Sequence, residues 1–113
     1  MAVRSANSSS PLTVWAVSAA VASDQGQCPS ATYAFTGTDT TNGRPGRIET
    51  RWRQPDGTLS EPVIDGVPAG ASTVISTLEF TVTGDRAADS AAVFEVLSRL
   101  RQHSAPLPLH YLC

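Results

Sequence analysis

Hydrophobic and polar residues alternate along most of this chain with a period of two, which is the pattern of half-buried β-strands. Residues that favour turns, mainly Gly, Pro, Asn and Asp, interrupt the alternation at short intervals. Seven segments fit this description: residues 12–18, 31–36, 47–54, 61–65, 72–83, 91–102 and 106–113. Short strands with frequent turns predict an all-β fold, an immunoglobulin-like antiparallel β-sandwich of about seven strands.

The parity of the hydrophobic positions predicts which side of each strand faces the core. In residues 47–54, Ile48 and Trp52 share one side and arginines occupy most of the other. Residues 72–83 show the same division, with hydrophobic residues on one side and threonines with a glutamate on the other. The residues expected in the core are Tyr33, Phe35, Trp52, Leu78, Phe80, Val82, Leu109 and Tyr111.

One segment, residues 91–102, fits two periods. Val96 and Leu100 have the spacing of a helix face, and Asp89 is a suitable helix cap. Phe94 and Val96 also fall on alternate positions, as in a strand. We expect a strand, because the flanking strands need a partner here and tertiary contacts override local propensity. A helix is the alternative.

The ends of the fold and its turns are also indicated by the sequence. Residues 1–11 are small and polar and are expected to form a flexible linker, which leaves residues 12–113 as one domain. Residues 42–46 contain two glycines and a proline and are expected to form a loop. Gln54 to Gly57 is expected to form a type I turn, because Pro55 stands at its second position.

Composition limits the class of protein. The chain has 113 residues, of which 41% are hydrophobic and 16% charged, as in a folded domain rather than a disordered one. The formal net charge of −2 gives no basic field, so we expect no nucleic-acid partner. No stretch is long enough for a transmembrane helix, so we expect no membrane insertion by this segment. Residues 12–22 match a secretory signal poorly, and any export signal or anchor is expected outside this chain.

Two cysteines lie far apart in the sequence, Cys28 before the second predicted strand and Cys113 at the end of the last. In the immunoglobulin topology both positions fall at the same pole of the sandwich. We therefore expect a Cys28–Cys113 disulfide, which would contribute about 4–5 kcal/mol in the simple chain-entropy model. A disulfide indicates an oxidising compartment, and hence an extracellular or cell-surface location. The alternative is a pair of free thiols in a cytosolic protein.

Four short motifs in this chain are shared with a known group of proteins: Cys28-Pro29, Tyr33-Ala34-Phe35-Thr36-Gly37-Thr38, Arg51-Trp52-Arg53 followed by Asp56-Gly57, and the closing Leu109-His110-Tyr111-Leu112-Cys113. From about residue 12 to its end, the chain resembles immunoglobulin-like modules of actinobacteria. Those modules stand at the extracytoplasmic C-terminus of some serine/threonine protein kinases and in secreted proteins. The resemblance implies an accessory or sensor ectodomain without catalytic residues. Residues 87–101 depart from the plainer strand of these modules.

Side chains that could carry out chemistry are few. The histidines are His103 and His110, both near the C-terminus, and no arrangement with a nucleophile and a carboxylate is indicated. A zinc site made of His103, His110 and Cys113 would lack a fourth ligand and a regular spacing. We therefore expect that the protein is not an enzyme and that it carries no cofactor and no metal.

A row of charged residues is the candidate interaction face. It comprises Arg47, Glu49, Arg51 and Arg53, which project from one side of a single predicted strand. Arginine is favoured at interfaces and binds anionic groups through two parallel hydrogen bonds. The competing interpretation is a solvated face on which Glu49 and Glu95 act as cross-strand partners of the arginines.

These patterns predict a non-catalytic extracytoplasmic accessory, sensor or interaction domain of a secreted or membrane-anchored protein. Its partner would be a protein or a component of the cell envelope. Two alternatives stay open. One is a β-sandwich that binds carbohydrate or cell wall, for which Trp15 is the best exposed aromatic candidate. The other is a small cytosolic α+β protein with a helix over residues 87–102.

Overall fold

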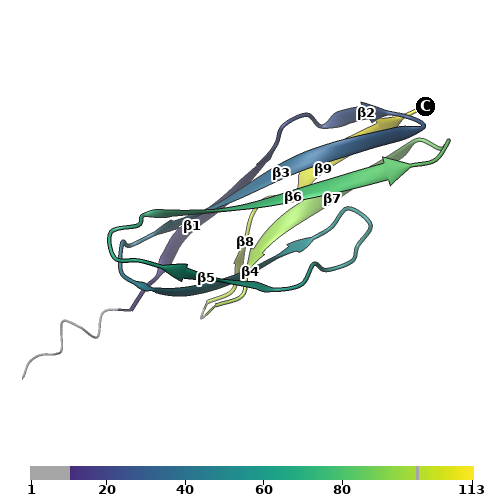
Figure 1. The fold of residues 1–113 in the computed structure, drawn as a ribbon. Helices are drawn as coiled ribbons and strands as arrows, with labels where there is room; N and C mark the ends of the chain where they lie inside the picture. The colour runs from purple at the N-terminus through teal and green to yellow at the C-terminus, as the bar shows by residue number, and fades with distance from the viewer. Residues whose placement is uncertain (1–10, 99) are drawn as a thin grey trace, which may run out of the picture.

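The computed structural model describes residues 11–98 and 100–113, and all regular structure in this part is β-strand (Figure 1). The strands in chain order are β1 (Val14–Val21), β2 (Gln25–Gln27), β3 (Ser30–Thr41), β4 (Gly46–Arg53), β5 (Val63–Val67), β6 (Thr73–Thr83), β7 (Ala88–Val96), β8 (Gln102–His103) and β9 (Leu107–Leu112). The linker expected for residues 1–11 lies outside the described residues except for Pro11.

The strands form two sheets that pack as two layers (Figure 1). The smaller sheet has the order β1-β3-β6, and both of its pairings are antiparallel. The larger sheet has the order β2-β9-β7-β4-β5, and β8 pairs with β7 beside this path. Its pairings are antiparallel except for β2 and β9, which run parallel. The all-β prediction is therefore confirmed.

Each of the seven predicted segments overlaps a strand, although several of the strand ends differ from the predicted ones. The two further strands of the described chain, β2 and β8, have three and two residues, which is too short to show a period in the sequence. β3 continues to Thr41, well past the predicted end at residue 36. Its extension was hidden because the inward positions there are held by polar residues, Asp39 and Thr41, which are nevertheless buried.

The segment that fitted two periods is a strand, and the helix alternative is wrong. β7 lies between β4 and β9, and its Phe94 and Val96 side chains are only 0% and 1% exposed. The strand ends at Val96, earlier than predicted, and the chain folds back so that Gln102 pairs with Val96. Leu100, which contributed to the helical spacing, lies on this return and is 77% exposed.

Aromatic rings fill the space between the two sheets. The Trp52 ring on β4 has its centroid 4.8 Å from that of Phe94 on β7 and 6.0 Å from that of Phe35 on β3. The Trp52 indole N–H donates a hydrogen bond to Ser76 Oγ of β6 at 3.2 Å. Trp52 is thus held by both layers, because apolar contacts come from each sheet and its polar atom is satisfied across the core.

The predicted core residues divide according to the position of their strand. Those on β3, β4 and β9 are buried: Tyr33, Phe35, Trp52, Leu109 and Tyr111. Those on β6 pack against the same cluster but are only partly buried: Leu78, Phe80 and Val82. The physical reason is that β6 is an edge strand, paired with β3 alone, so its inward side chains are covered on fewer sides.

Two local features explain how the chain turns and packs. The predicted turn is present: the Gly57 N–H donates to the Gln54 carbonyl at 2.8 Å, and Asp56 accepts a hydrogen bond from the Thr58 N–H at 3.0 Å. On β3, Gly37 lies so close to Phe94 that a Cβ atom there would come within 2.5 Å of the ring. The two layers therefore approach each other closely at a position that has no side chain.

Candidate functional site

The predicted charged row lies on the outer side of β4, as the alternation required. Its central members are tied to β7 by one carboxylate. Arg51 Nε donates to Glu95 Oε1 at 2.7 Å, and Arg53 Nη2 donates to Glu95 Oε2 at 3.2 Å. Arg51 and Glu95 stand directly opposite each other in the antiparallel pairing. Glu95 is thus a cross-strand partner of the arginines, as the competing interpretation of a solvated charged face predicts for this residue.

Glu95 is held in its ionised form by these two neighbours. Its side chain is only 14% exposed, and burial by itself would raise the pKa of the carboxyl group. Hydrogen bonds and charge from Arg51 and Arg53 outweigh that cost, and they keep the pKa of Glu95 below its ordinary value. The pair of arginines is thereby fixed in orientation, with part of each guanidinium still free to bind another group.

A hollow on this outer face gathers more positive charge than Glu95 neutralises. It has a volume of about 180 Å³, and its lining includes Arg51, Arg53, Arg101, Glu95 and His103. Three guanidinium groups face one carboxylate, which leaves an excess of two positive charges at neutral pH. We name this hollow the arginine hollow. Its guanidinium groups can bind an anionic group, because guanidinium donates paired hydrogen bonds that match the geometry of carboxylate and phosphate.

Sequence reasoning missed two members of the arginine hollow. Arg101 and His103 come from the return after β7, and they reach the hollow only because β8 pairs with the end of β7. No period marks a two-residue strand, so the sequence carried no signal for this placement.

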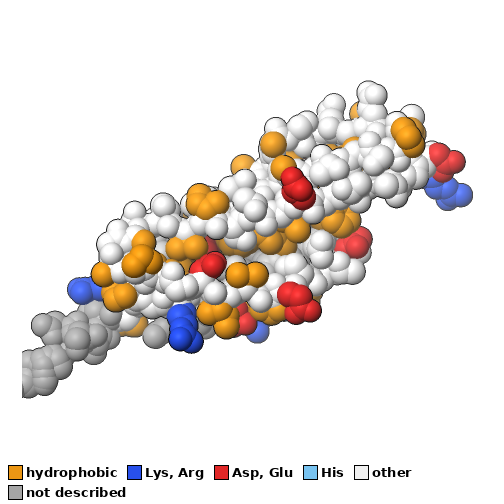
Figure 2. All heavy atoms as spheres, in the orientation of Figure 1, with side chains coloured by type: hydrophobic (Ala, Val, Ile, Leu, Met, Phe, Trp, Pro, Cys, Tyr) orange, Lys and Arg blue, Asp and Glu red, His pale blue; other side chains and the backbone are white. Residues whose placement is uncertain are grey.

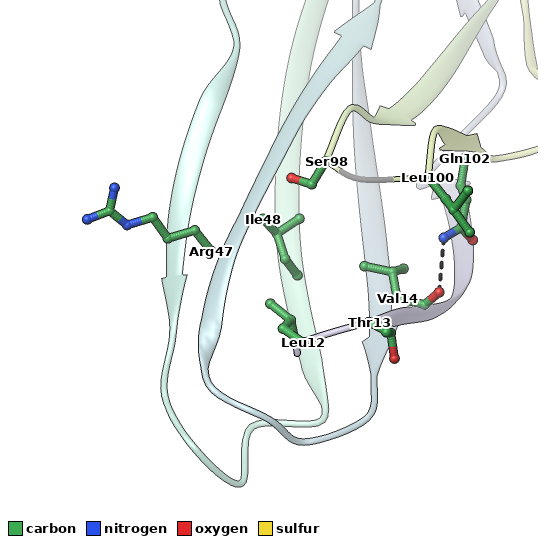
Figure 3. A pocket seen from close by; sticks show the side chains of 8 residues that line it. All are labelled: Leu12, Thr13, Val14, Arg47, Ile48, Ser98, Leu100 and Gln102. Carbon is green, nitrogen blue, oxygen red and sulfur yellow. Dashed lines mark hydrogen bonds between the residues drawn. The ribbon is translucent and has the colours of Figure 1, made fainter. Parts of the chain in front are cut away.

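The structure does not bring the whole predicted row together. Arg47 lines a different cavity, which has a volume of about 110 Å³. The apolar side chains of Leu12, Ile48 and Leu100 also line this cavity (Figure 3). In that view its guanidinium points away from the apolar side chains. Glu49 is anchored through its backbone, since its N–H donates to Ser98 Oγ at 2.6 Å. The candidate face thus has two parts, of which only the one around Arg51 and Arg53 is a charged hollow.

Cys28 directly follows β2 and Cys113 directly follows β9, and these two strands pair in parallel at one end of the sandwich (Figure 1). The Cys28 N–H donates to the Leu112 carbonyl at 2.8 Å, and the two cysteines approach each other to 2.5 Å. The two cysteines are therefore a possible pair, but the geometry does not define a disulfide bond. Desolvation and a hydrogen bond with Cys28 raise the pKa of the Cys113 thiol to about 11.

Asp39 is a buried carboxylate that sequence reasoning did not single out. It lies on the inward side of β3, is 1% exposed, and neither of its oxygens has a hydrogen-bond partner in the described part of the chain. Desolvation, with a smaller contribution from the charge of Asp65, raises its pKa to about 6. Its hydrophobic neighbours by register are Val17 on β1 and Val74 on β6. Asp39 therefore weakens the fold whenever it is ionised.

The histidines do not converge. His110 Nδ1 lies 2.8 Å from Asp89 Oδ1 on the outer side of the larger sheet, whereas His103 belongs to the arginine hollow. Among residues 11–98 and 100–113, no group of three or more His, Cys, Asp or Glu side chains is placed to hold a metal ion. Trp15, at the start of β1, is 69% exposed.

Within the described residues, the structure contains no helix with the length and hydropathy needed to span a membrane. No protein-family model matches the chain, and neither a curated protein nor a solved structure matches it.

Proposed function

We propose that this chain is a non-catalytic, extracytoplasmic interaction domain of immunoglobulin type, which binds an acidic protein or cell-envelope partner through the arginine hollow. Its setting would be a secreted or membrane-anchored protein, as an accessory or sensor module. The resemblance of its motifs to the actinobacterial modules supports this setting. The arrangement of charge on β4, β7 and β8 supports the binding role.

The strand order supports the immunoglobulin type. An immunoglobulin sandwich of the constant type has sheets A-B-E-D and G-F-C, and variable domains add strand C′ beside C. The smaller sheet here, β1-β3-β6, corresponds to A-B-E, and the run β9-β7-β4-β5 corresponds to G-F-C-C′. A buried tryptophan on strand C is a hallmark of the fold, and Trp52 is buried on β4. Neither β3 nor β7 carries a cysteine, so the central bridge of antibody domains has no counterpart.

The observation that carries the binding role is the excess charge of the arginine hollow. Arg51 is held by Glu95 and is only 21% exposed, so little side-chain entropy is lost when it binds a ligand. Arg53 and Arg101 are more exposed and supply the additional charge. A carboxylate-rich or phosphate-rich partner matches this arrangement, because each guanidinium offers paired donors to such groups.

A charge reversal tests the proposal. Arg101→Glu removes the excess without breaking the Arg51–Glu95 pair, and the matched control is Arg86→Glu, an exposed arginine on the loop between β6 and β7. We expect the unmodified chain to bind immobilised poly-L-glutamate at low ionic strength. Arg101→Glu should weaken this binding about tenfold or more, while Arg86→Glu should leave it within about twofold. Absence of binding, or equal losses in the two variants, would contradict the proposal.

The proposal includes a Cys28–Cys113 disulfide, since the two cysteines meet at one end of the sandwich. The raised pKa of Cys113 would slow alkylation of a free thiol in the folded protein, so alkylation is done after unfolding in guanidinium without a reductant. For material made under oxidising conditions, we expect the intact mass to show no added alkyl groups until a reductant is present. Immediate addition of two groups would contradict both the disulfide and the argument for an extracytoplasmic location.

A second candidate function, binding to a cell-wall polymer, rests on Trp15. This side chain is 69% exposed at the start of β1, on the side of the smaller sheet. Exposed aromatic rings pack against apolar faces of ligands while their polar edge stays in water. Retention on purified wall polymer that is lost in Trp15→Ala and kept in Arg101→Glu would favour this candidate over the arginine hollow.

A further inference from the structure

Besides the two-residue strand β8, the described part of the chain has four strands at sheet edges, and three of these edges are blunted against pairing with another strand. β1 carries a register irregularity between Val14 and Ala16, and the Gln102 side chain donates to its Val14 carbonyl at 2.9 Å. β2 has only three residues. β5 has five residues and is bracketed by Pro62 and Pro68. Bulges, short length and prolines are the devices with which soluble proteins prevent strand addition at an edge.

β6 has none of these devices. It is eleven residues long, pairs continuously with β3 from Thr73 to Thr83, and leaves its other edge without a strand in the described structure. It contains no proline and no basic residue, and its one charged residue is Glu79. Seven of its eleven residues are β-branched, which favours the extended conformation. An edge of this length and composition is a ready template for another strand.

Apolar side chains flank the open edge of β6. Ile75 on its outer side is 58% exposed, and Val63, which has the inward parity of β5 in the facing sheet, is 51% exposed. Figure 2 shows hydrophobic side chains on this face, over β5 and along the seam between the layers. The inward residues Leu78 and Phe80 are only partly buried here, so a strand added to β6 would also cover them.

We propose that β6 is the dimerisation strand of this protein and that its partner is β6 of a second copy of the chain, paired antiparallel about a two-fold axis. This inference goes beyond the proposed function and does not rest on it. The two smaller sheets would then join into one sheet of six strands, β1-β3-β6 followed by β6-β3-β1 of the partner subunit. The interface is closed, because each copy contributes the one long open edge found among its described residues, and no further copy can add to that edge.

Self-complementarity favours a second copy as the occupant. Full overlap of two eleven-residue strands places Leu78 opposite Leu78 of the partner subunit, since Thr73 then meets Thr83 of the partner subunit. In this register inward residues meet inward residues, and Val74 meets Val82 of the partner subunit. Glu79 meets Thr77 of the partner subunit, so no two carboxylates stand opposite each other. Each copy thus offers the other an uncharged, β-branched strand of matching length and parity.

The register gives a sharp test by substitution of one exposed residue. In this register, residue 77 of each copy lies opposite Glu79 of the partner subunit. Thr77→Glu therefore creates two pairs of facing carboxylates in the dimer, whereas Thr77→Lys creates two pairs of an ammonium group with a carboxylate. Both variants change the same position on the outer side of β6 by one charge. The matched control is Ser18→Glu, which adds a carboxylate to the same outer face on β1, away from the proposed interface. Molar mass is measured by light scattering and sedimentation over a range of protein concentrations.

We expect a concentration-dependent dimer of the full chain. Thr77→Glu should raise its dissociation constant about five- to thirtyfold, because like charges directly opposite in a sheet are destabilising. Thr77→Lys should leave the dissociation constant unchanged or lower it, and Ser18→Glu should leave it unchanged. A chain that stays monomeric at all concentrations overturns the inference. Equal effects of Thr77→Glu and Thr77→Lys, or oligomers larger than a dimer, overturn it as well, because they indicate a different interface.

Discussion

The outer faces of the two sheets differ in chemistry although their inner faces are built alike. On the larger sheet, the outer side of β4 and β7 carries Arg51, Arg53 and Glu95, joined by short ion pairs. On the smaller sheet, the outer side of β3 and β6 is made mainly of threonines, and Thr32 and Thr81 are joined by a hydrogen bond of 2.8 Å between their hydroxyls. Glu79 is the one charged residue among the outer positions of these two strands.

This difference separates two ways of binding. The binding proposed for the arginine hollow would depend on charge and would weaken as salt screens it, with a Debye length of about 10 Å at 0.1 M ionic strength. The pairing proposed for β6 would depend on backbone hydrogen bonds and apolar contacts, and it should respond little to salt. The outer faces of the two sheets can thus differ in charge although both sheets alternate in the same way, because the core requires apolar residues only at the inner positions.

The largest expected effect concerns the inner faces of the two sheets, each of which places a phenylalanine ring against Trp52. Phe35 on the smaller sheet and Phe94 on the larger sheet are 1% and 0% exposed and both pack on Trp52. Phe35→Ala and Phe94→Ala should each lower the free energy of unfolding by about 3–5 kcal/mol, measured by urea denaturation. A cost below about 1 kcal/mol for either variant would show that the two inner faces are not equivalent.

A smaller effect concerns Asp39, which breaks the apolar inner side of the smaller sheet. Its pKa of about 6 in the folded protein lies above the ordinary value of 3.8, so folding favours its protonated form. The free energy of unfolding should therefore fall as pH rises from about 4 to about 6, and the full penalty of about 2–3 kcal/mol should remain at higher pH.

Asp39→Asn removes this titration and should stabilise the protein by about that amount at pH 8, with the gain vanishing near pH 4. The measurement is urea denaturation at several pH values. Asp65→Asn is the control, since Asp65 supplies only the smaller contribution to the shift and should produce a smaller gain. A gain of equal size at pH 4 and pH 8 would contradict an ionisation penalty at Asp39.

The smallest effect compares the two outer faces directly. Glu95→Gln removes a carboxylate held by two arginines and should cost about 1 kcal/mol at pH 7, whereas Glu79→Gln on the threonine face should change stability by less than about 0.5 kcal/mol. The pKa of Glu95 is lowered, so its contribution is present above the ordinary carboxyl pKa and is lost as pH falls through the folded value. Thermal unfolding of both variants at pH 7 and pH 3 checks this. Equal costs in the two variants at pH 7 would remove the contrast between the faces.

The strands with a strong alternation could be predicted from the sequence. Trp52 and Ile48 were placed inward and the arginines of β4 outward because a strand points successive side chains to opposite faces. The alternation along β6 likewise predicts that Leu78 and Phe80 point inward, but it does not predict that they are only partly buried. Their exposure depends on β6 being an edge, and the position of a strand in a sheet is set by pairing over long sequence distances.

The arginine hollow was predictable only in part. Arg51, Arg53 and their partner Glu95 follow from parity and from the expectation that neighbouring strands pair. Arg101 and His103 join them through a two-residue strand that leaves no period. Asp39 was not predicted at all: it lies beyond residue 36, the predicted end of its strand, since a carboxylate normally indicates solvent. Only the packing of β1 and β6 around β3 buries it.

The all-β architecture, the inner and outer sides of the main strands, and the turn at Pro55 follow from the sequence alone, because each depends on neighbours along the chain. The positions of strands at the sheet edges and the gathering of charges in one hollow came only from the tertiary structure. The edge positions and the arginine hollow depend on contacts between residues far apart in sequence. Burial and strand pairing supply the free energy of these contacts, and local sequence patterns do not reveal them.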